Sequence, residues 1–165
     1  MSSSRARLRS DSIGTLVHEA IAAALTRERG GAPADAMAAG KAVVAPHLAP
    51  VYRLALIHRV TTATAVYLRD LRRDPSWVLT GVEVVVADVR LDLLFVNRAG
   101  RVEADEIKTG LLGPATEMPW IREQIGMQIA AGRDAFGSAF GGVRLVDLPR
   151  RKATLFRSAG GRTAA

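Results

Sequence analysis

The sequence predicts an α/β protein in which helices flank a central sheet, with an extra helical segment near the N-terminus. Three segments carry apolar residues at helical spacing, whereas the stretch from residue 77 to residue 108 holds short apolar segments separated by turns. Further apolar segments of strand length follow the last predicted helix. At 165 residues the chain is large enough to bury a core, so we expect one domain over residues 1–165.

The first helix is predicted from about residue 12 to residue 29, with Asp11 or Ser12 as its N-terminal cap. Its apolar stripe consists of Ile13, Leu16, Val17, Ala20, Ile21, Ala24 and Leu25. On a helical wheel His18 lies at the edge of this stripe, while Glu19 turns about 100° further, toward water. A histidine in such a place is ordinarily a partly buried residue with a backbone partner.

The segment after this helix predicts a loop, because residues 30–40 are Gly, Ala and Pro with little pattern. A second helix is expected from about 50 to 72, through the apolar residues Leu54, Ile57, Val60 and Val66, and it ends before Asp74-Pro75. The later elements are strands at about 77–86, 89–97 and 101–108, a helix at about 117–135, and strands near 142–148 and 152–157.

The second and third strands carry charged residues that point to chemistry. If the chain folds back about Ala99, Asp92 lies opposite Glu106, because the two are equally far from the turn. Lys108 shares the strand face of Glu106, whereas Asp105 points the other way and is expected to be structural or to pair with an arginine. Opposed carboxylates in apolar strands repel unless a cation joins them, which predicts a site for a hard divalent metal that handles phosphate.

An acid followed on the next strand by Glu106-Ile107-Lys108 resembles the motif of the PD-(D/E)XK nuclease superfamily. Further matches, in the order of its RecB-like exonuclease branch, are the helix from Gly14 to His18, an acid at Glu83, and glutamines at Gln124 and Gln128. Together these matches span about residues 11–135. Several motifs in the right order are more specific than a single Glu-x-Lys.

The resemblance implies a restriction-endonuclease-like core with a mixed sheet, in which the second helix is an insertion. It implies a metal-dependent DNA nuclease, exonuclease-like, that acts in DNA processing, repair or defence. Mg²⁺ or Mn²⁺ would be held by His18, Asp92, Glu106 and the backbone carbonyl of Ile107. Asp92, Glu106 and Lys108 would be catalytic, with Lys108 orienting the attacking water or stabilising the transition state.

Other residues are implied to support this site or to contact DNA: Glu83, Arg122, Gln124 and Gln128. From the residues alone, Glu83 fits a strand-end ion pair equally well. Gln128 follows Ile125 by three residues, so it borders the buried stripe and can face the sheet. The family's tyrosine, four residues after the glutamine, is Gly132 or Gln128 here. Trp120 could stack on a base, although a core position is the more ordinary place for it.

Composition narrows the class of protein. The net charge is +7 and the sequence pI about 10.9, which favours a polyanion such as DNA as partner, although base composition of the genome could also produce many arginines. The clusters best suited to phosphate contact are Arg5-Arg7-Arg9, Arg72-Arg73 and Arg150-Arg151-Lys152. The absence of cysteine excludes disulfides, thiolate zinc sites and cysteine-bound clusters.

Location and partners follow from size and hydropathy. No apolar run is long enough to cross a bilayer, so we expect a cytoplasmic protein with no membrane contact. A nuclease domain of this size is expected to work as a homo-oligomer or with a helicase or recombination partner. The termini, residues 1–10 and 158–165, are expected to be flexible.

Two other functions fit the same residues. A Holliday-junction or restriction-type endonuclease would use the same acids and lysine, although the helix histidine favours the RecB-like branch. A nuclease fold that only binds DNA would ordinarily have lost one of the three catalytic groups. The sequence leaves open whether cleavage begins at ends or internally, and whether RNA is also cut.

Overall fold

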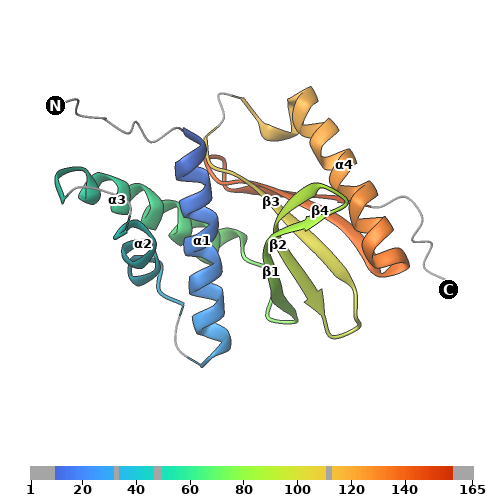
Figure 1. The fold of residues 1–165 in the computed structure, drawn as a ribbon, viewed down its shortest axis with the longest axis horizontal. Coiled ribbons are helices and arrows are strands. Elements are labelled where there is room, and N and C mark those ends of the chain that lie inside the picture. The colour runs from blue at the N-terminus through green and yellow to red at the C-terminus, as the bar shows by residue number, and fades with distance from the viewer. Residues whose placement is uncertain (1–9, 32–33, 47–49, 111–112, 158–165) are drawn as a thin grey trace.

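Five strands form one mixed sheet in the computed structural model, which describes residues 10–31, 34–46, 50–110 and 113–157. Helices α1, α2 and α3 lie on one side of this sheet and α4 lies on the other (Figure 1). The predicted α/β class is therefore confirmed. The terminal segments expected to be flexible lie outside the described residues, except for Ser10, where α1 begins.

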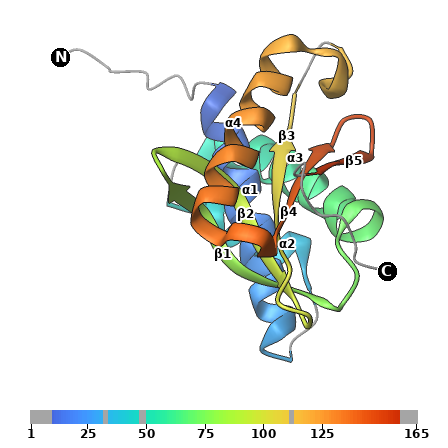
Figure 2. The same cartoon turned by 90° about the vertical axis from the view of Figure 1, so that its right-hand side faces the viewer.

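The sheet has the order β1-β2-β3-β4-β5, which Figure 2 shows from the side of α4. Its strands are β1(Trp77–Val86), β2(Val89–Asn97), β3(Val102–Lys108), β4(Phe140–Asp147) and β5(Lys152–Arg157), all close to their predicted bounds. Neighbours are antiparallel except β3 and β4, which are parallel and joined through α4. Leu93 pairs with Asp105 and Leu94 with Ala104, so the strands fold about Ala99 as predicted.

Helix α1(Ser10–Arg29) packs its apolar stripe on the sheet, with Ala20 and Ile21 fully buried. The predicted cap is wrong, because Asp11 and Ser12 lie inside a helix that already includes Ser10. The predicted phase of the helix is right. His18 is buried and Glu19 is exposed, so the two neighbours face opposite environments as the wheel indicates.

The loop predicted over residues 30–40 is wrong in its second half, where α2(Ala36–Val44) forms. Asp35 caps this helix by accepting hydrogen bonds from Met37 N at 2.9 Å and Ala38 N at 3.0 Å. Alanine favours the helix despite the weak apolar pattern. Gly40 lets α2 approach the next helix closely, because a Cβ there would lie 2.5 Å from Thr61 Oγ1.

The second predicted helix is α3(Pro50–Val66), continued by a π-helical turn, η1(Tyr67–Leu71). Its buried side carries Leu56, Val60 and Tyr67. Leu54, predicted to belong to the apolar stripe, is instead 77% exposed, because it is two positions from Leu56 and therefore far around the helix.

Helix α4(Pro119–Phe136) follows a short 3₁₀ turn, η2(Ala115–Glu117), and covers the opposite sheet face. Ile121 and Ile125 are buried there against Leu94 and Leu145. Gln128 is also buried on this side, as its spacing from Ile125 predicts.

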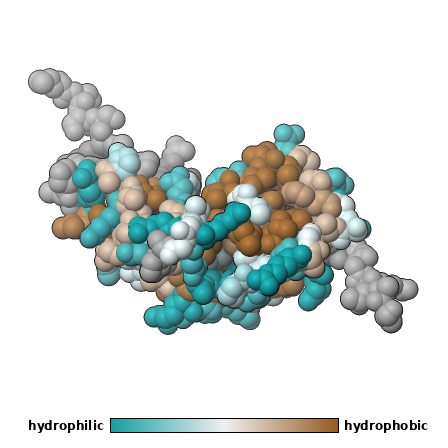
Figure 3. All heavy atoms as spheres, turned by 90° about the horizontal axis from the view of Figure 1, so that it is seen from below, coloured by the Kyte–Doolittle hydropathy of each residue, from teal (hydrophilic) through white to brown (hydrophobic). Residues whose placement is uncertain are grey.

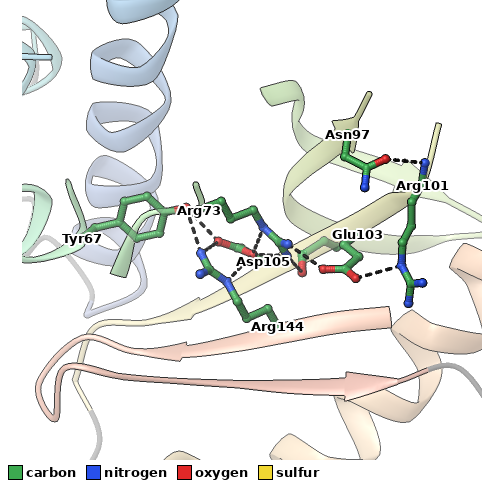
Figure 4. A network of polar contacts seen from close by, with 8 residues as sticks. Tyr67, Arg73, Asn97, Arg101, Glu103, Asp105 and Arg144 are labelled. Carbon is green, nitrogen blue, oxygen red and sulfur yellow. Dashed lines mark hydrogen bonds and ion pairs between the residues drawn. The ribbon is translucent and has the colours of Figure 1, made fainter. Parts of the chain in front are cut away.

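A buried ion network ties η1 and the segment after it to the sheet, and its members are Tyr67, Arg73, Glu103, Asp105 and Arg144 (Figure 4). Arg73 donates to Asp105 at 2.7 Å and to Glu103 at 2.6 Å, and its guanidinium lies over the ring of Trp77 at 4.7 Å. Asp105 is fully buried between Arg73 and Arg144, which confirms its predicted structural role.

The network overturns one expectation about phosphate contact, because Arg73 is almost entirely buried and already paired. Other members of the arginine clusters also have acidic partners. Arg72 pairs with Glu28 at 2.8 Å, Arg150 with Asp147 at 3.3 Å, and Arg151 with Asp70 at 3.8 Å. The cluster at residues 5–9 lies outside the described residues.

The surface view from below shows hydrophobic residues gathered on the half of the molecule that holds the sheet (Figure 3). Val78, Val82 and Val85 of β1, an edge strand, are among the exposed apolar side chains. Within the described ranges, no helix combines the length and apolar character needed to span a bilayer.

Candidate metal centre

The predicted site residues converge where β3 ends, beside the first half of α1 and the start of α4 (Figure 1). An open pocket of about 390 Å³ lies there. It is lined by His18 from α1, Asp92 from β2, Glu106 and Lys108 from β3, and Gln124 from α4, among others. Residues far apart in the sequence thus meet in one solvent-accessible hollow.

The imidazole of His18 is held in a defined orientation. Its Nδ1 lies 3.0 Å from Glu83 Oε1, and its Nε2 lies 3.3 Å from the Ile107 carbonyl oxygen and 3.5 Å from Asp92 Oδ2. A carboxylate that accepts from Nδ1–H leaves Nε2 as the metal-binding nitrogen, which is how metal-bound histidines are commonly oriented. Two further oxygens face that nitrogen.

Spacing around Nε2 suits a small cation. Adjacent ligands of an octahedral ion with bonds of about 2.1 Å lie about 3 Å apart, close to the separations of Nε2 from the Asp92 and Ile107 oxygens. Among the described residues, His18, Glu83 and Asp92 also form a group whose ligand atoms all lie within 4.8 Å of one another. Glu83 is therefore either the group that orients His18 or a direct ligand.

The backbone explains how Glu83 reaches this point. Val82 pairs with Leu93 and Val84 with Leu91, so Glu83 stands opposite Asp92 across the β1–β2 pair. Its φ of +50° lies in the left-handed region, which is rare for a residue with a side chain and common at strained functional positions. Arg90 adds an ion pair to Glu83 Oε2 at 2.9 Å.

The electrostatics of the cluster favour a cation. Burial, and after it the charge of Glu106, raises the pKa of Asp92 to about 6. Burial alone would lower the pKa of His18, but the hydrogen bond to Glu83 and the charge of Asp92 outweigh it and raise that pKa. The hydrogen bond from His18 lowers the pKa of Glu83. The ionised form of Asp92 is therefore disfavoured in this environment, and a cation bound beside it would relieve that cost.

Glu106 belongs to a second group of contacts on the α4 side. Its Oε1 accepts from Lys108 Nζ at 2.6 Å and from Gln124 Nε2 at 2.9 Å, and its Oε2 accepts from Gln128 Nε2 at 2.5 Å. Lys108 Nζ also donates to Gln124 Oε1 at 2.9 Å. Within the described chain, Gln128 Oε1 is buried with no hydrogen-bond partner. The two predicted glutamines thus hold the predicted acid and lysine in place.

Two residues of α4 differ from expectation in their surroundings. Trp120 is 53% exposed, so the core position considered for it is wrong, and Lys108 Nζ lies 5.2 Å from the centroid of its ring. Arg122 is exposed and donates to the Thr116 carbonyl at 2.9 Å, and it does not line the pocket.

The resemblance would place a tyrosine at Gly132 or Gln128, and the packing around Gly132 bears on the first of these positions. A Cβ at Gly132 would lie 2.4 Å from the ring of Phe140, so a side chain there would require that buried ring to move. Phe140, on β4, occupies the space instead. Trp120, in the first turn of α4, is an aromatic residue at the opposite end of the same helix.

Sequence reasoning missed two cations at the pocket. Arg90 pairs with Glu83 and lies 3.9 Å from Asp92 Oδ1; its spacing of two residues from Asp92 on one strand was an available signal. Arg59, on α3, also lines the pocket, and nothing in the local sequence distinguishes it from other surface arginines.

Comparison with models of known protein families, with curated proteins and with solved structures gave no match to this chain in any of the three. Function is therefore argued from the site itself.

Proposed function

We propose that the chain is a metal-dependent nuclease that hydrolyses phosphodiester bonds in DNA, on a restriction-endonuclease-like core of the RecB-like branch. The observation that carries this proposal is the orientation of His18. A Glu83 oxygen is hydrogen-bonded to Nδ1 of His18, and Nε2 of the same ring faces Asp92 and the Ile107 carbonyl. A ligand set of one imidazole and several oxygens, next to a lysine, suits Mg²⁺ or Mn²⁺ and phosphate chemistry.

Four groups would hold the ion: His18 Nε2, an Asp92 oxygen, the Ile107 carbonyl and Glu106. Glu106 can take part by exchanging one of its present contacts, because Lys108 and Gln124 share a single oxygen of that carboxylate. Glu83 and Gln128 would orient the ligands, since each already bonds one of them. A divalent ion there would lower the pKa of a bound water and neutralise charge on the phosphate.

Lys108 would act on the charge that develops at the phosphate. Its side chain is only 14% exposed, and Glu106 and Gln124 fix its ammonium group beside the proposed ligands. A positioned cation in a partly dry site stabilises a transition state much more than a mobile surface lysine does. Lys108 also offsets part of the repulsion between Asp92 and Glu106.

The positive charge of the protein and of the pocket lining favours a polyanionic substrate. The protein carries a net charge of +7, and Arg59, Arg90 and Lys108 line the pocket that holds the carboxylates. A polyanion whose backbone crosses the pocket would meet these cations while one phosphate lies at the proposed ion. DNA meets both requirements.

The test incubates the purified protein with linear duplex, circular duplex and single-stranded DNA, with EDTA, Mg²⁺ or Mn²⁺. Cleavage should require metal and should be lost in Glu106→Gln. Glu123→Gln, which removes an exposed carboxylate from α4 next to Gln124, is the matched control and should cut like the wild type. Cleavage by Glu106→Gln at the wild-type rate, or cleavage in EDTA, would contradict the proposal. Comparison of linear with circular DNA separates attack at ends from internal attack.

A further inference from the structure

The carboxylate pocket continues into a second hollow on the α3 side. This hollow, of about 340 Å³, lies between α3 and the turn that joins β4 to β5. Arg59 and Thr109 line both, so the two hollows adjoin. The two adjoining hollows extend from Gln124 of α4, past Glu106 and Lys108, to α3, and are called the channel below.

The α3 end of this channel is basic. Its polar lining is His58, Arg59, Thr62, Thr109 and Arg151, and none of the acidic residues that the structure describes lines it. In the part of the chain that the structure describes, Arg59 is exposed and has no carboxylate partner, whereas Arg72, Arg73 and Arg144 all do. An unpaired arginine in an acid-free hollow beside a phosphate-handling site is suited to bind a phosphate.

An exposed aromatic lies near the α4 end of the channel, beside Lys108, although it lines neither hollow. Trp120, in the first turn of α4, is 53% exposed, and Lys108 connects it to the carboxylates through the contact of its Nζ with the ring. Aromatic side chains beside a basic groove provide stacking surfaces for bases, and a base can stack on them only when it is not paired within a duplex.

We infer that the channel binds a single DNA strand, with an unpaired base on Trp120 and the backbone phosphates at Arg59. This inference rests on the proposed function and adds its substrate class: the strand that reaches the carboxylates is single, as at a free or frayed end. It also gives α3 a role. The helical segment between α1 and β1 is then the part of the protein that guides the strand away from the site.

The experiment measures binding without cleavage. Fluorescence anisotropy of a labelled single-stranded oligonucleotide is followed in EDTA over a range of salt concentrations. Loss of one phosphate contact lowers the slope of log K against log salt by about 0.7 for a single strand. Arg59→Ala should lose about that much, and Arg59→Lys should keep the wild-type slope. Arg98→Ala removes an exposed arginine from the β2–β3 turn, at the opposite end of these strands, and should keep it too.

Trp120 is tested in the same assay. Trp120→Ala should weaken single-strand binding at least about fivefold, whereas Trp120→Phe should retain most of it, because a ring still allows stacking. Met127→Ala is the matched control, since Met127 is also on α4 and is equally exposed at 53%. All these positions are exposed, so melting curves should remain close to wild type.

The outcomes separate this inference from the nuclease proposal. Metal-dependent cleavage by the wild type, with Arg59→Ala and Trp120→Ala binding like their controls, would overturn the channel and leave the nuclease intact. Single-strand binding that depends on Arg59 and Trp120, without cleavage in any metal, would support the channel and remove the nuclease. Tighter binding of blunt duplex than of the single strand would overturn the channel in either case.

Discussion

Replacing Asp92 by asparagine should make the metal-free protein more stable at neutral pH. Burial and the charge of Glu106 raise the pKa of Asp92 from 3.8 to about 6, so the ionised carboxylate is disfavoured in the folded state. At about 1.4 kcal/mol for each tenfold change in proton affinity, this costs about 3 kcal/mol at pH 7.5. Asparagine removes the charge and keeps an oxygen that can accept from Ile107 N, as Asp92 does at 2.8 Å.

The pH dependence has a definite sign. A carboxyl whose pKa is higher in the folded state than in the unfolded state binds protons more tightly when folded. Its destabilising effect is therefore complete above about pH 6 and disappears as the pH falls toward 3.8. The advantage of Asp92→Asn over the wild type should be greatest at neutral pH and vanish near pH 3.8.

Asp105 provides the control, because it is also a buried aspartate and lies on the next strand. It is fully buried between Arg73 and Arg144 and accepts a hydrogen bond from Tyr67 at 2.8 Å. Asp105→Asn leaves the Arg144 guanidinium without its charge partner and leaves Arg73 with Glu103 alone, which should destabilise the fold by about 3–5 kcal/mol. The same chemical change should thus have opposite effects at Asp92 and Asp105.

Urea denaturation at pH 7.5 in EDTA, followed by circular dichroism, measures both variants against the wild type. In a thermal melt of the same proteins, a change of about 3 kcal/mol in the free energy of unfolding corresponds to about 6–12 °C in melting temperature for a chain of this size. Addition of Mn²⁺ at about 100 times its Kd should stabilise the wild type by about 2.7 kcal/mol and Asp92→Asn much less. If Asp92→Asn were less stable than the wild type in EDTA, the carboxylate would already be satisfied within the protein, and the electrostatic argument for a cation would fail.

Three further outcomes are expected. Lys108→Ala should still bind metal and DNA but cut about 10²–10³-fold more slowly at saturating substrate, whereas loss of binding at unchanged turnover would make Lys108 a simple phosphate anchor. His18→Ala should weaken Mn²⁺ binding and activity, measured by titration of metal-dependent cleavage. Glu19→Ala, which changes the exposed side of the same helix, should weaken neither, and the reverse result would remove His18 from the ligand set. As the pH drops, calorimetric Mn²⁺ affinity of the wild type should begin to fall above pH 6.5, because His18 must be neutral to bind the ion and its pKa is raised above 6.5, and it should fall further through about pH 6, because Asp92 must be ionised. A constant affinity from pH 5 to 8 would contradict that ligand set.

The predictions from the sequence that were confirmed rest on the regular spacing of side chains in strands and helices. The alternation of side chains along β3 assigned Asp105 to one face and Glu106 to the other, and the contacts of each residue agree. The turn at Ala99 determined the strand register, and the helical wheel separated buried His18 from exposed Glu19. These inferences need only the local geometry of a strand or a helix.

What it missed depends on contacts between distant segments or on irregular backbone. The orientation of His18 by Glu83 requires a positive φ in the middle of β1, which no periodic pattern reveals. Arg73 was expected at the surface because arginine usually is, but the ion network buries it. Helix α2 was missed because its cap, Asp35, precedes a segment with almost no apolar spacing.

Two adjacent residues of β3, Asp105 and Glu106, take part in separate groups of contacts. Asp105 joins β3 to β4 and to the turn after α3, while Glu106 faces α4 and Lys108 and makes no contact in that network. Under the proposed function, a descendant that lost nuclease activity would be free to change Glu106, yet it would still need Asp105 and its arginines to fold. Inactive descendants should therefore be recognisable by an intact ion network next to an altered acid, and in a mutational scan protein yield should report on residue 105 and turnover on residue 106.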